Sequence, residues 1–147
     1  MTETKRTLRV LSPDDAAPTV HGAGDAYRFL ATGAETGGAY FMLEATVPPG
    51  GGPPPHIQTR EEEGFYVLEG TVEFLAGEGR KLSAGPGTMI HVPRGVLHSF
   101  RNQTDEVARM LIWFAPAGIE QMFLEVGEGS EGYAAIAARY GVEFPHP

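Results

Sequence analysis

Two histidines, a glutamine and a glutamate in this sequence have side chains that could together bind a metal ion. His56, Gln58 and Glu63 belong to the stretch HIQTREEEGFYVLEG, and His98 belongs to the later stretch GTMIHVPRGVLHSFRN. Imidazole nitrogens and carboxylate oxygens are common ligands of divalent metal ions in proteins. If strands bring the two stretches together, these side chains form a site for coordination chemistry.

Turn-forming residues around the two stretches predict how the chain positions these side chains. The segment PPGGGPPP just before His56 favours a rigid, extended approach. On a strand, His56 and Gln58 would then point to the same face, because side chains alternate between faces. Gly70 permits a tight reversal after the strand that Glu63 begins. Pro93-Arg94-Gly95 turns the chain again shortly before His98.

The middle of the chain consists of short apolar runs separated by turn residues. Many short strands with regular turn signals indicate a β-sandwich or barrel, so we predict an all-β fold. The predicted strands are Tyr27–Ala31, Ala39–Val47, Phe65–Leu68, Thr71–Ala76, Met89–Val92, His98–Asn102 and Val107–Ala115. A further apolar run, Leu8–Leu11, is interpreted as an edge strand that pairs with a partner subunit.

The pattern changes after Pro116, where helical spacing replaces strand alternation. Gly118–Val126 places apolar residues at helical intervals, and Tyr133–Tyr140 is rich in alanine. We expect one folded unit with three parts. These are an N-terminal arm or edge strand (1–25), a barrel (26–116) and a C-terminal helical extension packed on the barrel (117–147).

Composition excludes several classes of function. A net charge of −8 without a basic cluster argues against nucleic acid or an anionic membrane as partner. The absence of cysteine removes thiolate chemistry and fits a reducing compartment. No run approaches the roughly 18 apolar residues that a membrane-spanning helix needs, and the N-terminal residues lack the apolar core of a signal peptide. We therefore expect a cytoplasmic protein with a small-molecule partner.

The two stretches resemble the paired motifs of the cupin superfamily. His56-x-Gln58-x4-Glu63-x6-Gly70 is similar to the first cupin motif, which usually reads His-x-His, three or four residues, Glu, six residues, Gly. The second motif is matched at every fixed position by Gly87, Pro93, Gly95, His98 and Asn102. The short spacer and the helical tail resemble small single-domain cupins related to quercetin dioxygenases.

This resemblance implies a double-stranded β-helix, or jelly-roll barrel, that binds one divalent metal ion. Its ligands would be His56, Gln58, Glu63 and His98, with Fe, Mn, Ni, Cu or Zn as the metal. Gln58 departs from the pattern, since cupins usually carry a second histidine there; some, such as phosphomannose isomerases, use glutamine. Without Gln58 the residues still form a two-histidine, one-carboxylate set, which is typical of non-haem Fe(II) oxygenases.

Three hypotheses for function follow. The first is a dioxygenase-like oxidoreductase acting on a small enolic, aromatic or otherwise apolar substrate, with Glu63 as general base. The second is an isomerase, epimerase or lyase that uses the metal as a Lewis acid without redox chemistry. The third is a non-catalytic module that binds a small ligand. By analogy with small cupins, a homodimer is expected.

The remaining histidines and Asn102, the last residue of the second motif, are interpreted as structural residues rather than metal ligands. His91 lies between Ile90 and Val92, whose alternation places it on the outer face. His21 and His146 are expected to be exposed. Asn102 shares the strand parity of His98, so we expect it to face the same interior.

Overall fold

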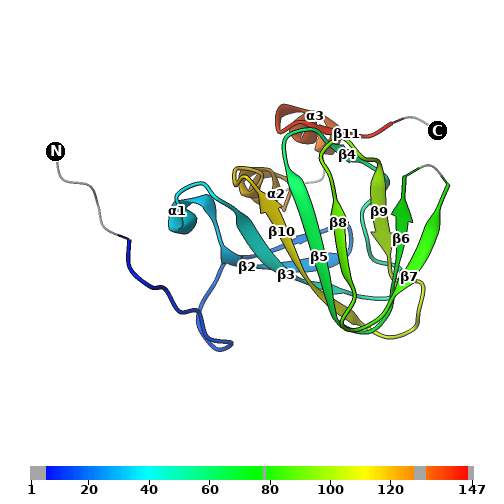
Figure 1. Ribbon diagram of the computed structural model, residues 1–147, viewed down its shortest axis with the longest axis horizontal. Helices are drawn as coiled ribbons and strands as arrows, with labels where there is room; N and C mark the ends of the chain where they lie inside the picture. The colour runs from blue at the N-terminus through cyan, green and yellow to red at the C-terminus, as the bar shows by residue number, and fades with distance from the viewer. Residues whose placement is uncertain (1–5, 78, 128–131, 146–147) are drawn as a thin grey trace.

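Strands make up most of the chain in the computed structural model, which describes residues 6–77, 79–127 and 132–145 (Figure 1). The large sheet has the order β1-β2-β3-β10-β5-β8, and the smaller sheet has the order β7-β6-β9. All pairings in both sheets are antiparallel. The strands of the large sheet are β1 (Thr19–Gly22), β2 (Asp25–Ala31), β3 (Phe41–Val47), β10 (Ala108–Ala115), β5 (Glu62–Glu69) and β8 (Met89–Val92); those of the smaller sheet are β7 (Lys81–Ala84), β6 (Val72–Ala76) and β9 (His98–Arg101).

Five short elements complete the described fold. Strand β4 pairs with β11 near the C-terminus, so the chain after the helices returns to the stretch that carries His56. None of the helices among the described residues is long and apolar enough to cross a membrane. The bounds are β4 (Ile57–Gln58), β11 (Val142–Glu143), α1 (Gly33–Thr36), α2 (Glu120–Gly127) and α3 (Tyr133–Arg139).

The hydrophobic core lies between the two sheets because alternate residues of each strand point inward. Strand β10 shows the alternation over its whole length, with every second residue buried. The ring of Phe65 from the large sheet lies 5.1 Å from Phe74 and 5.8 Å from Phe100 of the smaller sheet, measured between ring centroids. Both contacts have the edge-to-face geometry that aromatic pairs prefer. The predicted all-β fold with C-terminal helices is therefore confirmed, with the strands arranged as a sandwich of two sheets.

Helix α2 closes one end of the space between the sheets. Its Phe123 packs edge-on against Tyr27 of β2 at 5.3 Å and lies 5.8 Å from Phe114 of β10, again between ring centroids. The buried carboxylate of Glu120 accepts a hydrogen bond from the Gly33 amide at 2.6 Å, which ties the start of α2 to α1. The helical tail is thus an inner wall of the fold.

The seven strands predicted between residues 27 and 115 are all present, with ends shifted by at most three residues. The sequence analysis missed α1 and three strands, β1, β7 and β11, whereas β4 lies where His56 and Gln58 were expected on a strand. Each of these elements has only two to four residues. Such lengths are too short to show a periodic pattern.

The edge strand predicted at Leu8–Leu11, which would pair with a partner subunit, stays a prediction. No strand is present there, and Leu8 and Val10 are 87% and 71% exposed. The run extends away from the sheets (Figure 1) and is attached through side chains, with Arg9 donating a 2.7 Å hydrogen bond to the Leu30 carbonyl.

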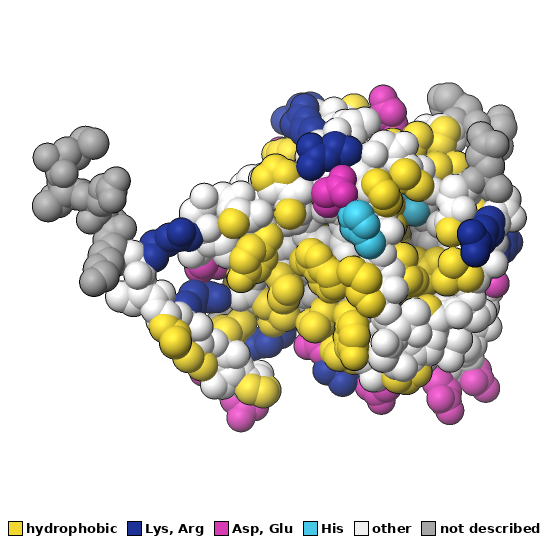
Figure 2. Space-filling model, viewed as in Figure 1, with side chains coloured by type: hydrophobic (Ala, Val, Ile, Leu, Met, Phe, Trp, Pro, Cys, Tyr) yellow, Lys and Arg dark blue, Asp and Glu magenta, His cyan; other side chains and the backbone are white. Residues whose placement is uncertain are grey.

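The outer face of the large sheet carries exposed apolar side chains, which gather in the middle of the view in Figure 2. Tyr66, Leu68 and Met89 on this face are between 37% and 52% exposed. The homodimer expected from the sequence stays a prediction, and this face is the apolar surface that such an assembly could bury.

The loop between β3 and β4 runs close to β9 because glycines remove side chains from the contact. A Cβ atom at Gly52 would lie 2.0 Å from the carbonyl oxygen of Phe100, and Gly52 also has a φ of +127°. Gly50 donates a hydrogen bond to the Asn102 carbonyl at 2.8 Å, and Asn102 donates one back to Gly51 at 3.0 Å. This loop fixes where the chain approaches His56.

We expect Gly52→Ala to destabilise the protein by about 3 kcal/mol or more, because it adds a clash with backbone to an unfavourable φ. Gly50→Ala is the matched control. Gly50 also has a positive φ, +81°, but nothing lies within 4 Å of its added Cβ, so the cost should be about 1–2 kcal/mol. Urea unfolding of both variants measures the difference. Equal losses would contradict the steric account.

Candidate metal centre and its pocket

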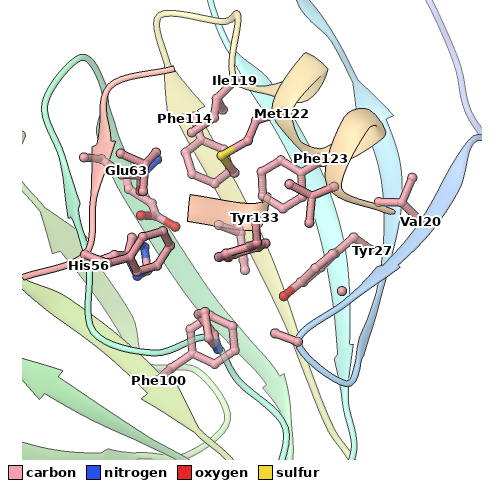
Figure 3. Close-up of a pocket in the computed structure, with 18 of the residues that line it drawn as sticks. Val20, Tyr27, His56, Glu63, Phe100, Phe114, Ile119, Met122, Phe123 and Tyr133 are labelled. Atoms are coloured by element: carbon pink, nitrogen blue, oxygen red, sulfur yellow. The ribbon is translucent and has the colours of Figure 1, made fainter. Parts of the chain in front are cut away.

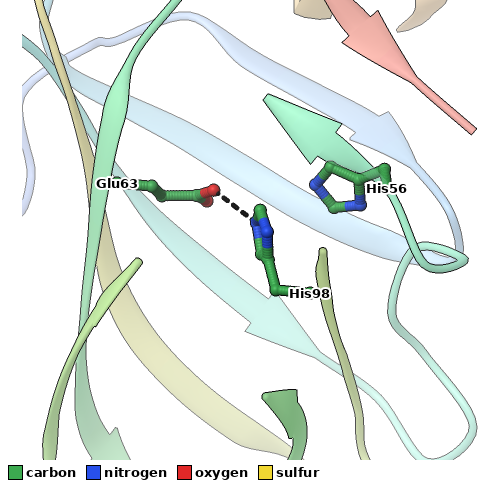
Figure 4. A group of neighbouring side chains, drawn as sticks. All are labelled: His56, Glu63 and His98. Carbon is green, nitrogen blue, oxygen red and sulfur yellow. Dashed lines mark hydrogen bonds and ion pairs between the residues drawn. The ribbon is translucent and has the colours of Figure 1, made fainter. Parts of the chain in front are cut away.

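The structure brings His56, Glu63 and His98 together at one place inside the fold (Figure 4). One potential ligand atom from each residue lies within 4.8 Å of the others. Glu63 comes from β5 of the large sheet, and His98 begins β9 of the smaller sheet. Three residues that are distant in sequence thus form one candidate donor set, made of two imidazoles and one carboxylate.

A β-bridge between the two histidines sets their spacing. The amide of His56 donates to the carbonyl of His98 at 3.0 Å, and the amide of His98 donates to the carbonyl of His56 at 3.0 Å. The imidazole rings consequently lie side by side, with centroids 4.4 Å apart. The backbone itself therefore determines how close the two rings come.

Each imidazole is also oriented by a backbone carbonyl. His56 Nδ1 lies 2.9 Å from the carbonyl oxygen of Pro54, and His98 Nδ1 lies 2.9 Å from that of Val96. A carbonyl oxygen only accepts hydrogen bonds, so Nδ1 is the protonated nitrogen in both rings. The Nε2 atoms are left to face the site, which is the arrangement typical of metal-binding histidines.

Glu63 faces His98 directly, with its Oε1 atom 2.8 Å from His98 Nε2. Both side chains are buried. A buried carboxylate next to an imidazole lone pair is stable only with a positive charge between or beside them, either a proton or a metal cation. This donor set therefore fits a divalent metal ion.

Burial and the contact between Glu63 and His98 shift the pKa values of these three groups. It lowers the pKa of His56 to about 4, helped by the charge of neighbouring His98, so His56 is neutral near pH 7 and free to act as a ligand. Burial raises the pKa of Glu63, against the opposing hydrogen bond from His98. Burial alone would lower the pKa of His98, but its hydrogen bond and attraction to Glu63 outweigh that effect and raise it.

Gln58 lies in the same pocket wall as His56 and Glu63. Its side chain is buried, and its Oε1 atom has no hydrogen-bond partner among the described residues. Burying an amide oxygen without a partner costs about 1–3 kcal/mol. A cation at the neighbouring site would supply the missing partner, which fits the sequence-based assignment of Gln58 as a metal ligand.

These residues line one side of a largely apolar pocket between the large sheet and the C-terminal helices (Figure 3). The pocket contains about 700 Å³ of free space when its open mouth is counted. Helix α2 and the segment after α3 form much of the wall opposite the sheet. The apolar lining comes from Val20, Pro53, Phe100, Ile112, Phe114, Ile119, Met122, Phe123, Val126, Val142 and Phe144.

The remaining histidines and Asn102, for which expectations were also drawn from the sequence, lie outside the candidate donor set. His91 is on the outer face as predicted, exposed and 2.9 Å from Glu62 through its Nε2 atom. His21 is exposed as predicted, but it also lines the pocket; His146 lies outside the described residues. Asn102 is buried, and its amide donates at 2.9 Å to the carbonyl of Val47, so it holds two loops together.

Sequence reasoning missed Asp25, and it treated Tyr27 only as the start of a strand, although the pair borders the pocket. The Tyr27 hydroxyl donates to Asp25 Oδ2 at 2.8 Å, and both residues are buried. A signal was available, because Asp25, Tyr27 and Phe29 share one face of a strand and that face is apolar. An acidic residue at an inward position of a strand is rarely buried without a partner.

The fold and the buried His–Glu–His arrangement define a β-sandwich protein with a candidate mononuclear metal centre facing a small-molecule pocket. Residues 43–114 match the Cupin domain family. Polyketide synthase CurC of Streptomyces cyaneus is 37% identical over 116 residues, which cover 76% of this chain and 72% of CurC. The chain belongs to the cupin superfamily.

Two other relatives carry different activities in their names. Quercetin 2,3-dioxygenase of Bacillus subtilis is 28% identical over 130 residues, 82% of this chain, but the match spans only 38% of the length of that enzyme. The solved structure of the polyketide cyclase RemF from Streptomyces resistomycificus superposes with a TM-score of 0.63 and 30% identity, and the match covers 74% of this chain and 79% of RemF.

We expect His98→Ala to abolish stoichiometric binding of a divalent metal. The loss should exceed the roughly 10- to 100-fold that removal of an outer-shell partner costs, because a direct ligand is removed. His91→Ala is the control, since His91 lies on the outer face beside Glu62. Elemental analysis and zinc titration of both variants measure the effect. Full metal content in His98→Ala would exclude this residue as a ligand.

Gln58→Leu tests the glutamine separately, because leucine has a similar size but no donor oxygen. We expect metal affinity to fall roughly 10-fold or more, whereas Gln58→His should retain it by restoring an imidazole. Gln103→Leu, at an exposed position, controls for loss of an amide elsewhere. Competition with a chelating dye measures the affinities. Unchanged metal affinity in Gln58→Leu would mean that the Gln58 amide lines the pocket but does not bind the metal.

Proposed function

We propose that this protein is a metal-dependent cupin enzyme that cyclises or isomerises an oxygenated aromatic or polyketide-like molecule without redox chemistry. The observation that carries the proposal is that His56 and Glu63 of the His56–Glu63–His98 set line a pocket whose other walls are mostly apolar. Such a pocket favours a molecule with a large apolar body that presents oxygen atoms at the metal centre.

The comparisons support this reading over the dioxygenase hypothesis that the sequence favoured. The chain matches most of the length of CurC and RemF, whose names refer to polyketide synthesis and cyclisation. It matches 38% of the Bacillus quercetin dioxygenase and 30% of the one from Aspergillus japonicus. A relative of similar extent is the better guide to activity, because the remainder of a longer enzyme can contribute to its site.

The metal would be held by His56, Glu63 and His98, with Gln58 as a fourth ligand, and would act as a Lewis acid on a substrate oxygen. Glu63 is the residue that moves a proton. Its carboxylate lines the pocket and would accept a proton from a carbon next to a carbonyl group, which is the first step of carbon–carbon bond formation between two parts of a poly-β-ketone. The apolar walls exclude water and fold the substrate so that the two reacting carbons meet.

A dioxygenase remains the second candidate, because one specific observation favours it. Two histidines and one carboxylate with open positions are the donor set of non-haem Fe(II) oxygenases. The relatives named quercetin 2,3-dioxygenase support the same reading.

Exchange of the metal and removal of oxygen separate the two candidates. For the proposed cyclase we expect the zinc-loaded protein to convert a linear poly-β-ketone under anaerobic conditions. Glu63→Gln should lower that rate by about 10²-fold or more, because it removes the proton acceptor. Product mass spectrometry with parallel oxygen-electrode traces measures both activities. Turnover that requires iron and consumes oxygen would replace the cyclase proposal by the dioxygenase.

A further inference from the structure

Tyr27 and Asp25 place a second polar group at the pocket, and neither residue belongs to the candidate metal centre. The Tyr27 hydroxyl lies 2.8 Å from Asp25 Oδ2, and Tyr27 lines the pocket. The two residues are 6% and 1% exposed. They form a tyrosine–carboxylate pair built into the inner face of β2.

This pair lies on the opposite side of the pocket from the metal centre. Strands β3 and β10 separate β2 from β5, which carries Glu63. Three strand spacings correspond to about 14 Å along the sheet. In Figure 3, Tyr27 and Glu63 border opposite sides of the pocket, and the ring of Tyr27 extends inward with its hydroxyl leading. The wall between them is formed mainly by apolar residues such as Phe114 and Phe123.

The burial of Asp25 calls for an explanation, because its Oδ1 atom has no hydrogen-bond partner among the described residues. A buried acceptor without a partner is costly, and replacing it by an apolar residue would remove that cost. The backbone is nevertheless fitted around the carboxylate. A Cβ atom at Gly51 would lie 2.4 Å from Asp25 Oδ1, so only glycine leaves room for it.

We propose that Tyr27, held in place by Asp25, binds an oxygen atom at the end of the substrate remote from the metal centre. This inference rests on the proposed function, because the near end of the same molecule must be held at the metal. It specifies the substrate class further, as an elongated, flat molecule with an apolar middle and oxygen atoms at both ends.

The pair can bind either a hydroxyl or a carbonyl oxygen. With Asp25 ionised, the Tyr27 hydroxyl donates to the carboxylate, and its oxygen accepts a hydrogen bond from a substrate hydroxyl. With Asp25 protonated, the carboxyl donates to Tyr27, and Tyr27 donates to a substrate carbonyl. Burial raises the pKa of Asp25 to about 7, against the opposing hydrogen bond from Tyr27, so both forms are available at neutral pH.

Two flavonols that differ by one hydroxyl test the proposal. Both 3-hydroxyflavone and 3,4′-dihydroxyflavone carry the same metal-chelating hydroxyl and ketone, and only the second has a hydroxyl at the far end. We expect the zinc-loaded, anaerobic wild type to bind the dihydroxy compound about five- to tenfold more tightly, the typical effect of one hydrogen bond. Tyr27→Phe should bind the two compounds within about twofold of each other and bind 3-hydroxyflavone as the wild type does. Titration calorimetry measures the four affinities.

Tyr66→Phe removes a hydroxyl from the outer face of the large sheet and should leave all affinities unchanged. Tyr27→Phe leaves Asp25 buried without its hydrogen bond, so the double variant Asp25→Asn/Tyr27→Phe, which also removes the carboxylate, is measured in parallel. Unchanged binding of 3-hydroxyflavone shows that the pocket of each variant is intact.

Two results would overturn this inference while leaving the proposed function in place. One is a preference for the dihydroxy compound that survives in both Tyr27 variants, and the other is equal binding of the two flavonols by the wild type. Failure of the wild type to bind either flavonol would contradict the inference together with the proposed aromatic substrate class.

Discussion

The two backbone hydrogen bonds between His56 and His98 are the interaction on which the rest of the site depends. They attach the proline-rich loop to the start of β9, so that a residue outside the regular strands is held as firmly as one within them. Because each imidazole is then oriented by a carbonyl two residues earlier in the chain, the Nε2 atoms need no further adjustment to face Glu63. The backbone prepares the donor set before any ion is bound, which lowers the entropic cost of binding.

Much of this arrangement could be predicted from the sequence, because it depends on local chemistry. The glycine and proline turns place the strands between residues 27 and 115. The grouping of His56, Glu63 and His98 also follows from residue type and spacing, since imidazole and carboxylate donors on facing strands have few alternative positions. Local pattern and tertiary structure agree in this region.

The features that the sequence did not reveal are those decided by distant partners. The two residues of β11 become a strand because they pair with β4, after the chain has passed through the C-terminal helices. The contact of Phe123 in α2 with Tyr27 of β2 likewise joins residues far apart in the sequence. In each case the deciding contact joins segments or side chains whose packing no local periodicity encodes.

Under the proposed function, catalysis and selection of the substrate would depend on different structural elements around the pocket. The donor set is built on β5, β9 and the loop before β4, whereas the opposite wall comes from Met122 and Phe123 of α2 and Tyr133 of α3. Changes in these helices would alter the shape of the cavity without moving a ligand, since the histidines are fixed by the strand backbone. Relatives named for dioxygenation and for cyclisation both resemble this chain, so the shared fold alone does not fix the reaction.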